Sequence, residues 1–79
     1  MAMSKTKSNF LKNLGKRIAF LREKNGLNQA QLGMECEKDR QSINRLEKGN
    51  VNPSIFYLYQ ISQSLNVRLT ELLDAKELE

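Results

Sequence analysis

A short segment in the middle of the chain, DRQSINRLEKG (residues 39–49), carries residue types suited to reading the edges of base pairs. Wound as a helix at about 100° per residue, it places five side chains on one arc without an acid: Arg40, Gln41, Asn44, Arg45 and Lys48. Arg donates two hydrogen bonds to guanine, and Gln or Asn pairs with a donor and an acceptor of adenine. A solvent-exposed helix face would instead be rich in Lys and Glu in pairs three or four residues apart. The arc therefore favours contact with DNA.

The opposite side of this segment combines Ile43 and Leu46 with an acid, Glu47. A carboxylate among apolar side chains is costly unless it is paired. Arg22 directly follows Leu21, so it lies at the edge of the apolar stripe of an earlier helix. We expect Arg22 and Glu47 to form a structural salt bridge that ties the two helices together.

The elements that position these groups are helices, and we find no strand pattern or repeat. A first helix is predicted over about residues 8–24, because apolar residues recur there at steps of three and four. These residues are Phe10, Leu14, Ile18 and Leu21. Asn25 and Gly26 end this helix, since Gly accepts a left-handed backbone.

The next three helices are each marked at their start by a capping residue. The caps, each with the helix it begins, are Asn28 (29–36), Asp39 (40–48) and Ser54 (55–65). Gln31 completes a capping box with Asn28, and Gly49 closes the third helix. Gly33 lies inside the second helix at a cost of about 1 kcal/mol, which we attribute to close approach of another helix.

The fourth helix is expected to bury Ile55, Leu58, Ile61 and Leu65, and Asn66 ends it. A fifth helix begins at about Leu69 and runs into the tail. The sequence thus predicts an all-α, compact five-helix bundle with a helix-turn-helix. Residues 1–9 are expected to form a flexible basic arm, residues 10–75 the domain, and residues 76–79 a C-terminal tail.

Charge is distributed unevenly along the 79 residues, whose net charge is +4. Residues 1–25 carry seven Lys or Arg and one acid, whereas residues 51–79 carry two basic residues and four acids. Such polarity suggests a polyanion on one side of the molecule. A solvated surface with randomly placed charges would explain the same numbers.

The composition argues against several classes of protein. One cysteine and no histidine leave no intramolecular disulfide, no Cys/His zinc site and no imidazole base, so we expect no enzyme, metal or cofactor. Cys36 lies on an apolar helix face, as a small buried residue would. No apolar stretch approaches the roughly 20 residues needed to span a bilayer, and no signal peptide is evident. We expect a soluble cytoplasmic protein without a membrane partner.

The run GLNQAQLGMECEKDRQSINRLEKGNVNPS (residues 26–54) resembles the Cro/phage-repressor (Xre-like) helix-turn-helix family. The likeness is greatest to lambdoid phage repressor DNA-binding domains and covers about residues 14–73. LNQAQL, SINRLEKG, NPS and LNVRLTELL occur in the family's order and spacing. The resemblance implies a five-helix fold in which the third helix enters the major groove. Short controller-type regulators also belong to this family.

The resemblance also implies which residues contact DNA. Base contacts fall on Arg40, Gln41 and Arg45, with Asn44 beside them. Phosphate contacts fall on Gln29, at the first turn of the second helix, and on Asn50 and Asn52 in the following loop. We add as further phosphate candidates Asn28, Lys38, Ser42 and Lys48. The family also has the Arg–Glu pair at Arg22 and Glu47.

The turn between the second and third helices departs from the family pattern. Glu37 stands where the family usually has Gly, and Lys38 where it usually has an apolar residue. Either Glu37 accepts a left-handed backbone at some cost, or the turn differs. Lys38 is expected to lay its methylenes over the core edge and to extend its ammonium towards a phosphate.

These observations predict a sequence-specific transcriptional regulator that binds palindromic double-stranded DNA as a homodimer. The candidate dimer residues, some of which must instead be core, are Tyr57, Tyr59, Leu69, Leu72, Leu73 and Leu78. A toxin and RNA polymerase are candidate protein partners. The alternative is an antitoxin or other protein-interaction module that keeps the fold. Such a module would be expected to lose the amides and guanidinium groups of the third helix, which this chain retains.

Overall fold

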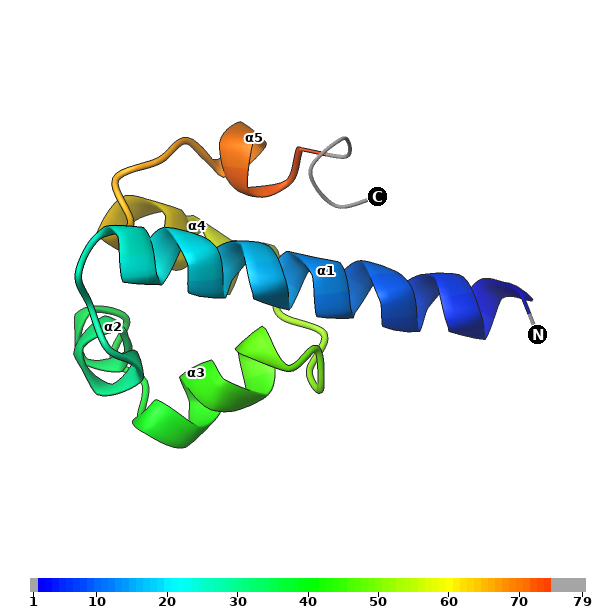
Figure 1. Cartoon of the computed structure of the whole chain (residues 1–79), viewed down its shortest axis with the longest axis horizontal. Coiled ribbons are helices and arrows are strands. Elements are labelled where there is room, and N and C mark those ends of the chain that lie inside the picture. The colour runs from blue at the N-terminus through cyan, green and yellow to red at the C-terminus, as the bar shows by residue number, and fades with distance from the viewer. Residues whose placement is uncertain (1, 75–79) are drawn as a thin grey trace.

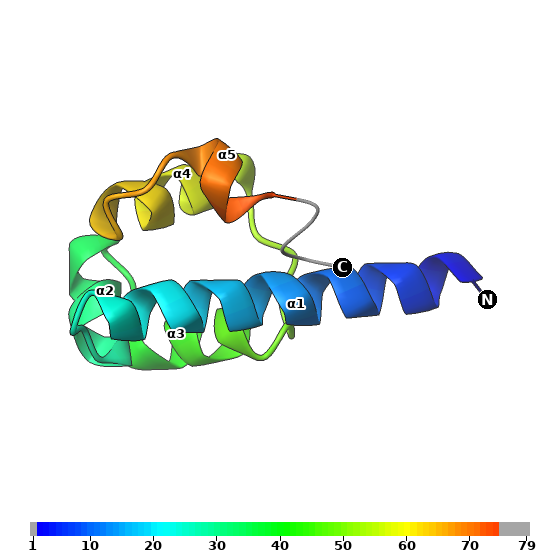
Figure 2. The ribbon, with the colours of Figure 1, turned by 45° about the horizontal axis from the view of Figure 1, so that its top comes forward.

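The chain forms five helices, and four of them fold around the inner part of the first (Figure 1). The computed structural model describes residues 2–74, with side chains from Thr6 onward, and contains no strand within that range. The helices are α1 (Ala2–Lys24), α2 (Gln29–Glu35), α3 (Arg40–Glu47), α4 (Ile55–Ser64) and α5 (Leu69–Leu72). α2 and α3 lie on one side of α1, and α4 and α5 lie on the other (Figures 1 and 2). The predicted all-α, five-helix architecture is thus confirmed. Over the described residues, no helix is both long and apolar enough to cross a membrane.

The core lies where the five helices converge. Its members, all nine-tenths or more buried, are Leu14, Ile18, Leu21, Leu32, Cys36, Ile43, Leu46, Tyr57, Leu58, Ile61, Leu65 and Leu72. Two predicted core residues are wrong: Phe10 is 43% exposed and Ile55 is 65% exposed. Phe10 lies four residues before Leu14, the first core residue of α1, and Ile55 is the first residue of α4. The periodicity of apolar residues shows which face of a helix is apolar, but it does not show where the neighbouring helices that cover this face end.

α1 is longer than the sequence predicts. It begins at Ala2, so residues 2–9 are helical where an arm was expected. No Gly or Pro interrupts residues 2–13, and Ala, Met, Leu and Lys in this segment favour helix. The figures show this end of α1 projecting beyond the bundle (Figures 1 and 2).

The predicted caps and stops of the inner helices are confirmed. Asn28 and Gln31 form a complete capping box, with Gln31 N donating to Asn28 Oδ1 at 2.8 Å and Asn28 N donating to Gln31 Oε1 at 2.7 Å. Asp39 and Ser54 each accept a backbone N–H three residues ahead. The chain turns with a positive φ at Gly26, Gly49 and Asn66. α2, α3 and α4 each end one residue earlier than predicted, and the tail after Asp74 lies outside the described residues.

Candidate nucleic-acid interface

α3 presents polar donors outward and anchors itself through its inner face. Arg40, Gln41 and Arg45 are exposed, while Ile43 and Leu46 are buried in the core. The N-cap at Asp39 fixes the start of the helix: Ser42 N donates to Asp39 Oδ1 at 2.7 Å. That bond lowers the pKa of the Asp39 carboxyl. The arrangement leaves three long donor side chains on a helix whose backbone is held from behind.

The end of α3 is held by the ion pair that the sequence predicts. Arg22 Nε donates to Glu47 Oε2 at 2.6 Å, and Arg22 Nη2 donates to Glu47 Oε1 at 3.1 Å. The Arg22 and Glu47 side chains are only 10% and 7% exposed. The remaining guanidinium nitrogen, Nη1, donates to the carbonyl of Leu27 at 2.8 Å. The hydrogen bonds to Glu47 raise the pKa of Arg22, and the pair joins α1 to α3.

Gln29 extends this pair into a network that sequence reasoning missed. Gln29 Nε2 donates to Glu47 Oε1 at 2.9 Å, and Asn44 Nδ2 donates to Gln29 Oε1 at 3.4 Å. Gln29 and Asn44 are half-buried. Part of the hydrogen-bonding capacity of these two amides is therefore spent inside the protein. Both bonds join α2 to α3, so no local pattern in the sequence signals them.

The turn before α3 uses a left-handed residue without glycine. Glu37 has a φ of 56°, which settles the alternative left open by the sequence. Gly33 is also explained differently from the expectation. A Cβ built on Gly33 would lie 2.7 Å from the carbonyl oxygen of Lys38, and Lys38 N donates to Gly33 O at 2.7 Å. Gly33 therefore makes room for the turn itself rather than for another helix.

Lys38 lies against an aromatic ring. Its ammonium is 4.8 Å from the centroid of the Tyr57 ring, a cation–π geometry. Tyr57 is buried, and its hydroxyl has no hydrogen-bond partner among the described residues. Burial raises the pKa of Tyr57 to about 12, so the phenol is neutral at physiological pH. The Lys38 ammonium thus covers the core edge, where the sequence analysis expects its methylenes.

The remaining phosphate candidates come from α3 and from the segments before and after it. Asn28 is exposed at the start of α2, and Lys48, Asn50 and Asn52 are exposed at and after the end of α3. Ser42 is half-buried on α3. Four of the five are exposed and so accessible to a ligand.

The predicted dimer residues separate into core and surface. Tyr57 and Leu72 are buried within the core, so their assignment to an interface is wrong. Leu69 and Leu73 are half-buried, Tyr59 is 48% exposed, and Leu78 lies outside the described residues. The sequence analysis missed two exposed apolar residues of α4, Ile55 and Phe56. Phe56 stacks on Tyr59 with ring centroids 6.3 Å apart.

Comparison with known proteins gives consistent matches. The model of a family described as "Helix-turn-helix" matches residues 18–72. The HTH-type transcriptional regulator SlrR of Bacillus subtilis is 34% identical over 64 residues, which cover 80% of this chain but 42% of SlrR. The chain thus spans less than half the length of SlrR.

Two further relatives are matched over most of their length. An uncharacterised HTH-type transcriptional regulator of Sinorhizobium fredii, y4dJ, is 34% identical over 78% of this chain and 80% of its own. One from Archaeoglobus fulgidus is 38% identical over 71% of this chain and 80% of its own. The crystal structure of the restriction-modification controller protein C.AhdI from Aeromonas hydrophila superposes with a TM-score of 0.76 at 29% identity. That match covers 78% of this chain and 94% of C.AhdI.

Proposed function

We propose that this chain, which belongs to the helix-turn-helix family of DNA-binding transcriptional regulators, binds a palindromic operator as a homodimer with α3 in the major groove. The observation that carries the proposal is the exposed, acid-free arc of Arg40, Gln41 and Arg45 on a helix held by a buried ion pair. Base readout needs donors held in one orientation. The Arg22–Glu47 pair supports that orientation from the far side of the helix.

The proposed contacts divide into two kinds. Arg40, Gln41 and Arg45 read base edges, and Asn44, which lies beside them, is a fourth candidate for a base contact. Phosphate contacts come from seven residues on α3 or in the segments before and after it: Asn28, Gln29, Lys38, Ser42, Lys48, Asn50 and Asn52. Phosphate contacts fix the register of α3, whereas base contacts carry the sequence information.

The proposed dimer forms through α4 and α5. The exposed Ile55, Phe56 and Tyr59 offer apolar area on α4, and the half-buried Leu69 and Leu73 extend it onto α5. A two-fold axis through this surface would pair it with the same surface of a second chain. The dimer would then present two copies of α3 to one face of a duplex. Their separation would then match one helical turn of DNA, about 34 Å.

Selection from a randomised duplex pool tests the proposal. The full chain is used to enrich binding sequences, and native mass spectrometry gives the stoichiometry of the selected complex. We expect inverted half-sites, two chains per duplex, and an affinity that falls steeply with salt as phosphate contacts are screened. Failure to enrich any sequence would refute DNA readout and favour a protein-interaction module. One chain on a site without inverted repeats would refute the dimer.

A further inference from the structure

The outer end of α1 lies outside the segment that defines the family. The family match begins at residue 18, whereas α1 begins at Ala2. No acid occurs in the first 22 residues of the chain. This basic, helical extension projects past the bundle on the side where the loop between α3 and α4 crosses beneath α1 (Figure 1).

The loop that follows α3 is seated directly on this part of α1. A Cβ built on Gly49 would lie 2.7 Å from the Cα of Lys12, so only glycine lets the two backbones approach this closely. Gly15 does the same one turn along, where a Cβ would meet the carbonyl oxygen of Glu47 at 2.2 Å. Two backbone contacts therefore fix the middle of α1, at Lys12 and Gly15, relative to the end of α3.

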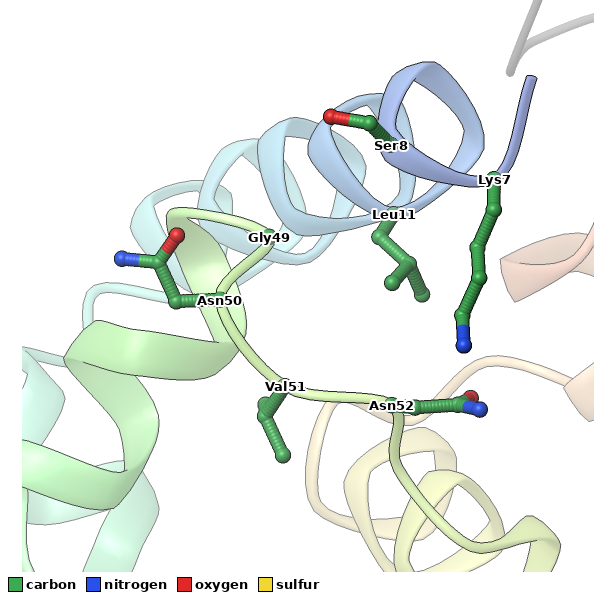
Figure 3. A pocket seen from close by; sticks show the side chains of 7 residues that line it. All are labelled: Lys7, Ser8, Leu11, Gly49, Asn50, Val51 and Asn52. Carbon is green, nitrogen blue, oxygen red and sulfur yellow. The ribbon is translucent and has the colours of Figure 1, made fainter. Parts of the chain in front are cut away.

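A groove of about 360 Å³ opens where α1 and the loop meet. It is lined by Lys7, Ser8, Leu11, Gly49, Asn50, Val51 and Asn52, with no acid among them. Liquid water occupies about 30 Å³ per molecule, so the groove has room for a phosphodiester group with its water. Figure 3 shows the Lys7 side chain descending from α1 towards the level of the Asn52 amide on the loop.

Lys7 occupies a position that is unusual for a lysine. It precedes Leu11, Leu14 and Ile18 at steps of four, three and four, so it continues the face of α1 that is buried farther along. Where that face leaves the bundle, the chain places a cation. Lys7 is exposed and forms no salt bridge with the side chains described from residue 6 to residue 74.

We infer that this groove binds a backbone phosphate of the operator, beside the end of α3, with the Lys7 ammonium and the Asn52 amide as donors. The inference rests on the proposed DNA binding and adds a contact from outside the family segment. A phosphate suits the groove because no carboxylate is among its described lining residues, and because the loop that forms one wall is adjacent to the recognition helix. The extension of α1 would thus add one phosphate contact between the protein and each half-site of the operator.

The test compares Lys7→Gln with Lys16→Gln on the duplex selected by the wild-type chain. Lys16 is also exposed on α1, and nine residues separate it from Lys7, which places it on the opposite face. Because each of the two chains loses one phosphate contact, Lys7→Gln should lower the slope of log affinity against log salt by about 1.8. Between 50 and 200 mM salt, the wild-type chain should therefore lose about twelvefold more affinity than Lys7→Gln. Lys16→Gln should match the wild type, and Lys7→Arg should restore the wild-type slope.

The outcomes separate the two proposals. If wild-type chain selects no duplex, the proposed function fails and this contact fails with it. If wild type binds a selected duplex and Lys7→Gln has the same salt slope as Lys16→Gln, only the α1 contact is refuted. Circular dichroism of each variant verifies that α1 remains folded. Loss of affinity by Lys7→Gln with an unchanged salt slope would assign Lys7 a structural role and also refute the phosphate contact.

Discussion

The two ends of α3 are held in opposite ways. At its C-terminal end, Arg22 and Glu47 are buried and joined by two hydrogen bonds, and Gly15 lets α1 touch the helix backbone. At its N-terminal end, the exposed Asp39 caps the first turn and Glu37 adopts a left-handed conformation. One end depends on tertiary contacts in the core, and the other on local backbone geometry at the surface.

Because of this difference, the two ends of α3 should contribute unequally to the stability of the fold. When one partner of a buried ion pair or backbone contact is removed, the other partner finds no replacement in water. The C-terminal end of α3 should therefore contribute most to the free energy of unfolding. Exposed caps and turns contribute less, because water replaces the lost hydrogen bonds. Substitutions at the two ends should therefore differ in size, and at the turn even in sign.

Glu47→Ala should have the largest effect. It leaves the Arg22 guanidinium buried without its partner, which should lower the free energy of unfolding by about 3–5 kcal/mol. Glu23→Ala is the matched control, since Glu23 lies 3.8 Å from Arg22 but is 72% exposed and should matter by less than about 1 kcal/mol. Urea denaturation measures both, and Glu47→Gln serves if Glu47→Ala does not fold. Equal stability of the Glu47→Ala and Glu23→Ala variants would contradict a buried clamp.

Gly15→Ala should come next. Its methyl group would meet the backbone carbonyl of Glu47 at 2.2 Å, and neither helix can yield by rotating a side chain. Overpacking of this kind costs about 1–3 kcal/mol. Lys16→Ala, at the adjacent exposed position, should change stability by no more than about 0.5 kcal/mol. A melting temperature for Gly15→Ala equal to that of the control would show that α1 and α3 are not in backbone contact.

Glu37→Gly should act in the opposite direction and more weakly. The left-handed backbone at Glu37 costs an L-residue about 1–2 kcal/mol. Glycine avoids this cost, but it loses more conformational entropy on folding, which offsets part of the gain. We expect a net gain of about 0.5–1 kcal/mol. Glu35→Gly, two residues earlier at the last residue of α2, should instead destabilise by up to about 1 kcal/mol. Denaturation curves that shift in the same direction for both variants would contradict the left-handed turn.

Asp39 should give the smallest effect, visible as a dependence on pH. Its pKa is lowered by the backbone N–H of Ser42, so its carboxylate stabilises the fold above the unfolded pKa of about 3.9. That stabilisation should disappear as the pH falls through the lower folded pKa. The melting temperature of the wild-type chain, minus that of Asp39→Asn, should therefore decline on acidification below about pH 4. A difference that stays constant with pH would show that the cap does not depend on the charge.

Local signals in the sequence predicted the inner part of the fold well. Asn28, Asp39 and Ser54 cap the helices because each acts on its own next turn, and Gly49 ends α3 for a similarly local reason. The Arg22–Glu47 pair was also predictable, since a carboxylate on an apolar face demands a partner.

The features that were missed depend on how far apart elements lie in space. The exposure of Phe10 and Ile55 follows from where the neighbouring helices stop, which periodicity does not record. The burial of Tyr57 depends on the same packing. Gly15 shows no local requirement for glycine, and its role appears only once α3 lies against it. Within the candidate interface, the bond from Gln29 to Glu47 is equally non-local.

Base readout by α3 is tested most directly by measuring the affinity of Gln41→Ala and Arg45→Ala for the selected duplex and for every single base-pair substitution in one half-site. Each variant should lose about 1–3 kcal/mol of discrimination at one base pair and keep the preferences of the wild-type chain elsewhere. A loss of the same size on every duplex, with all preferences retained, would contradict base readout by these side chains.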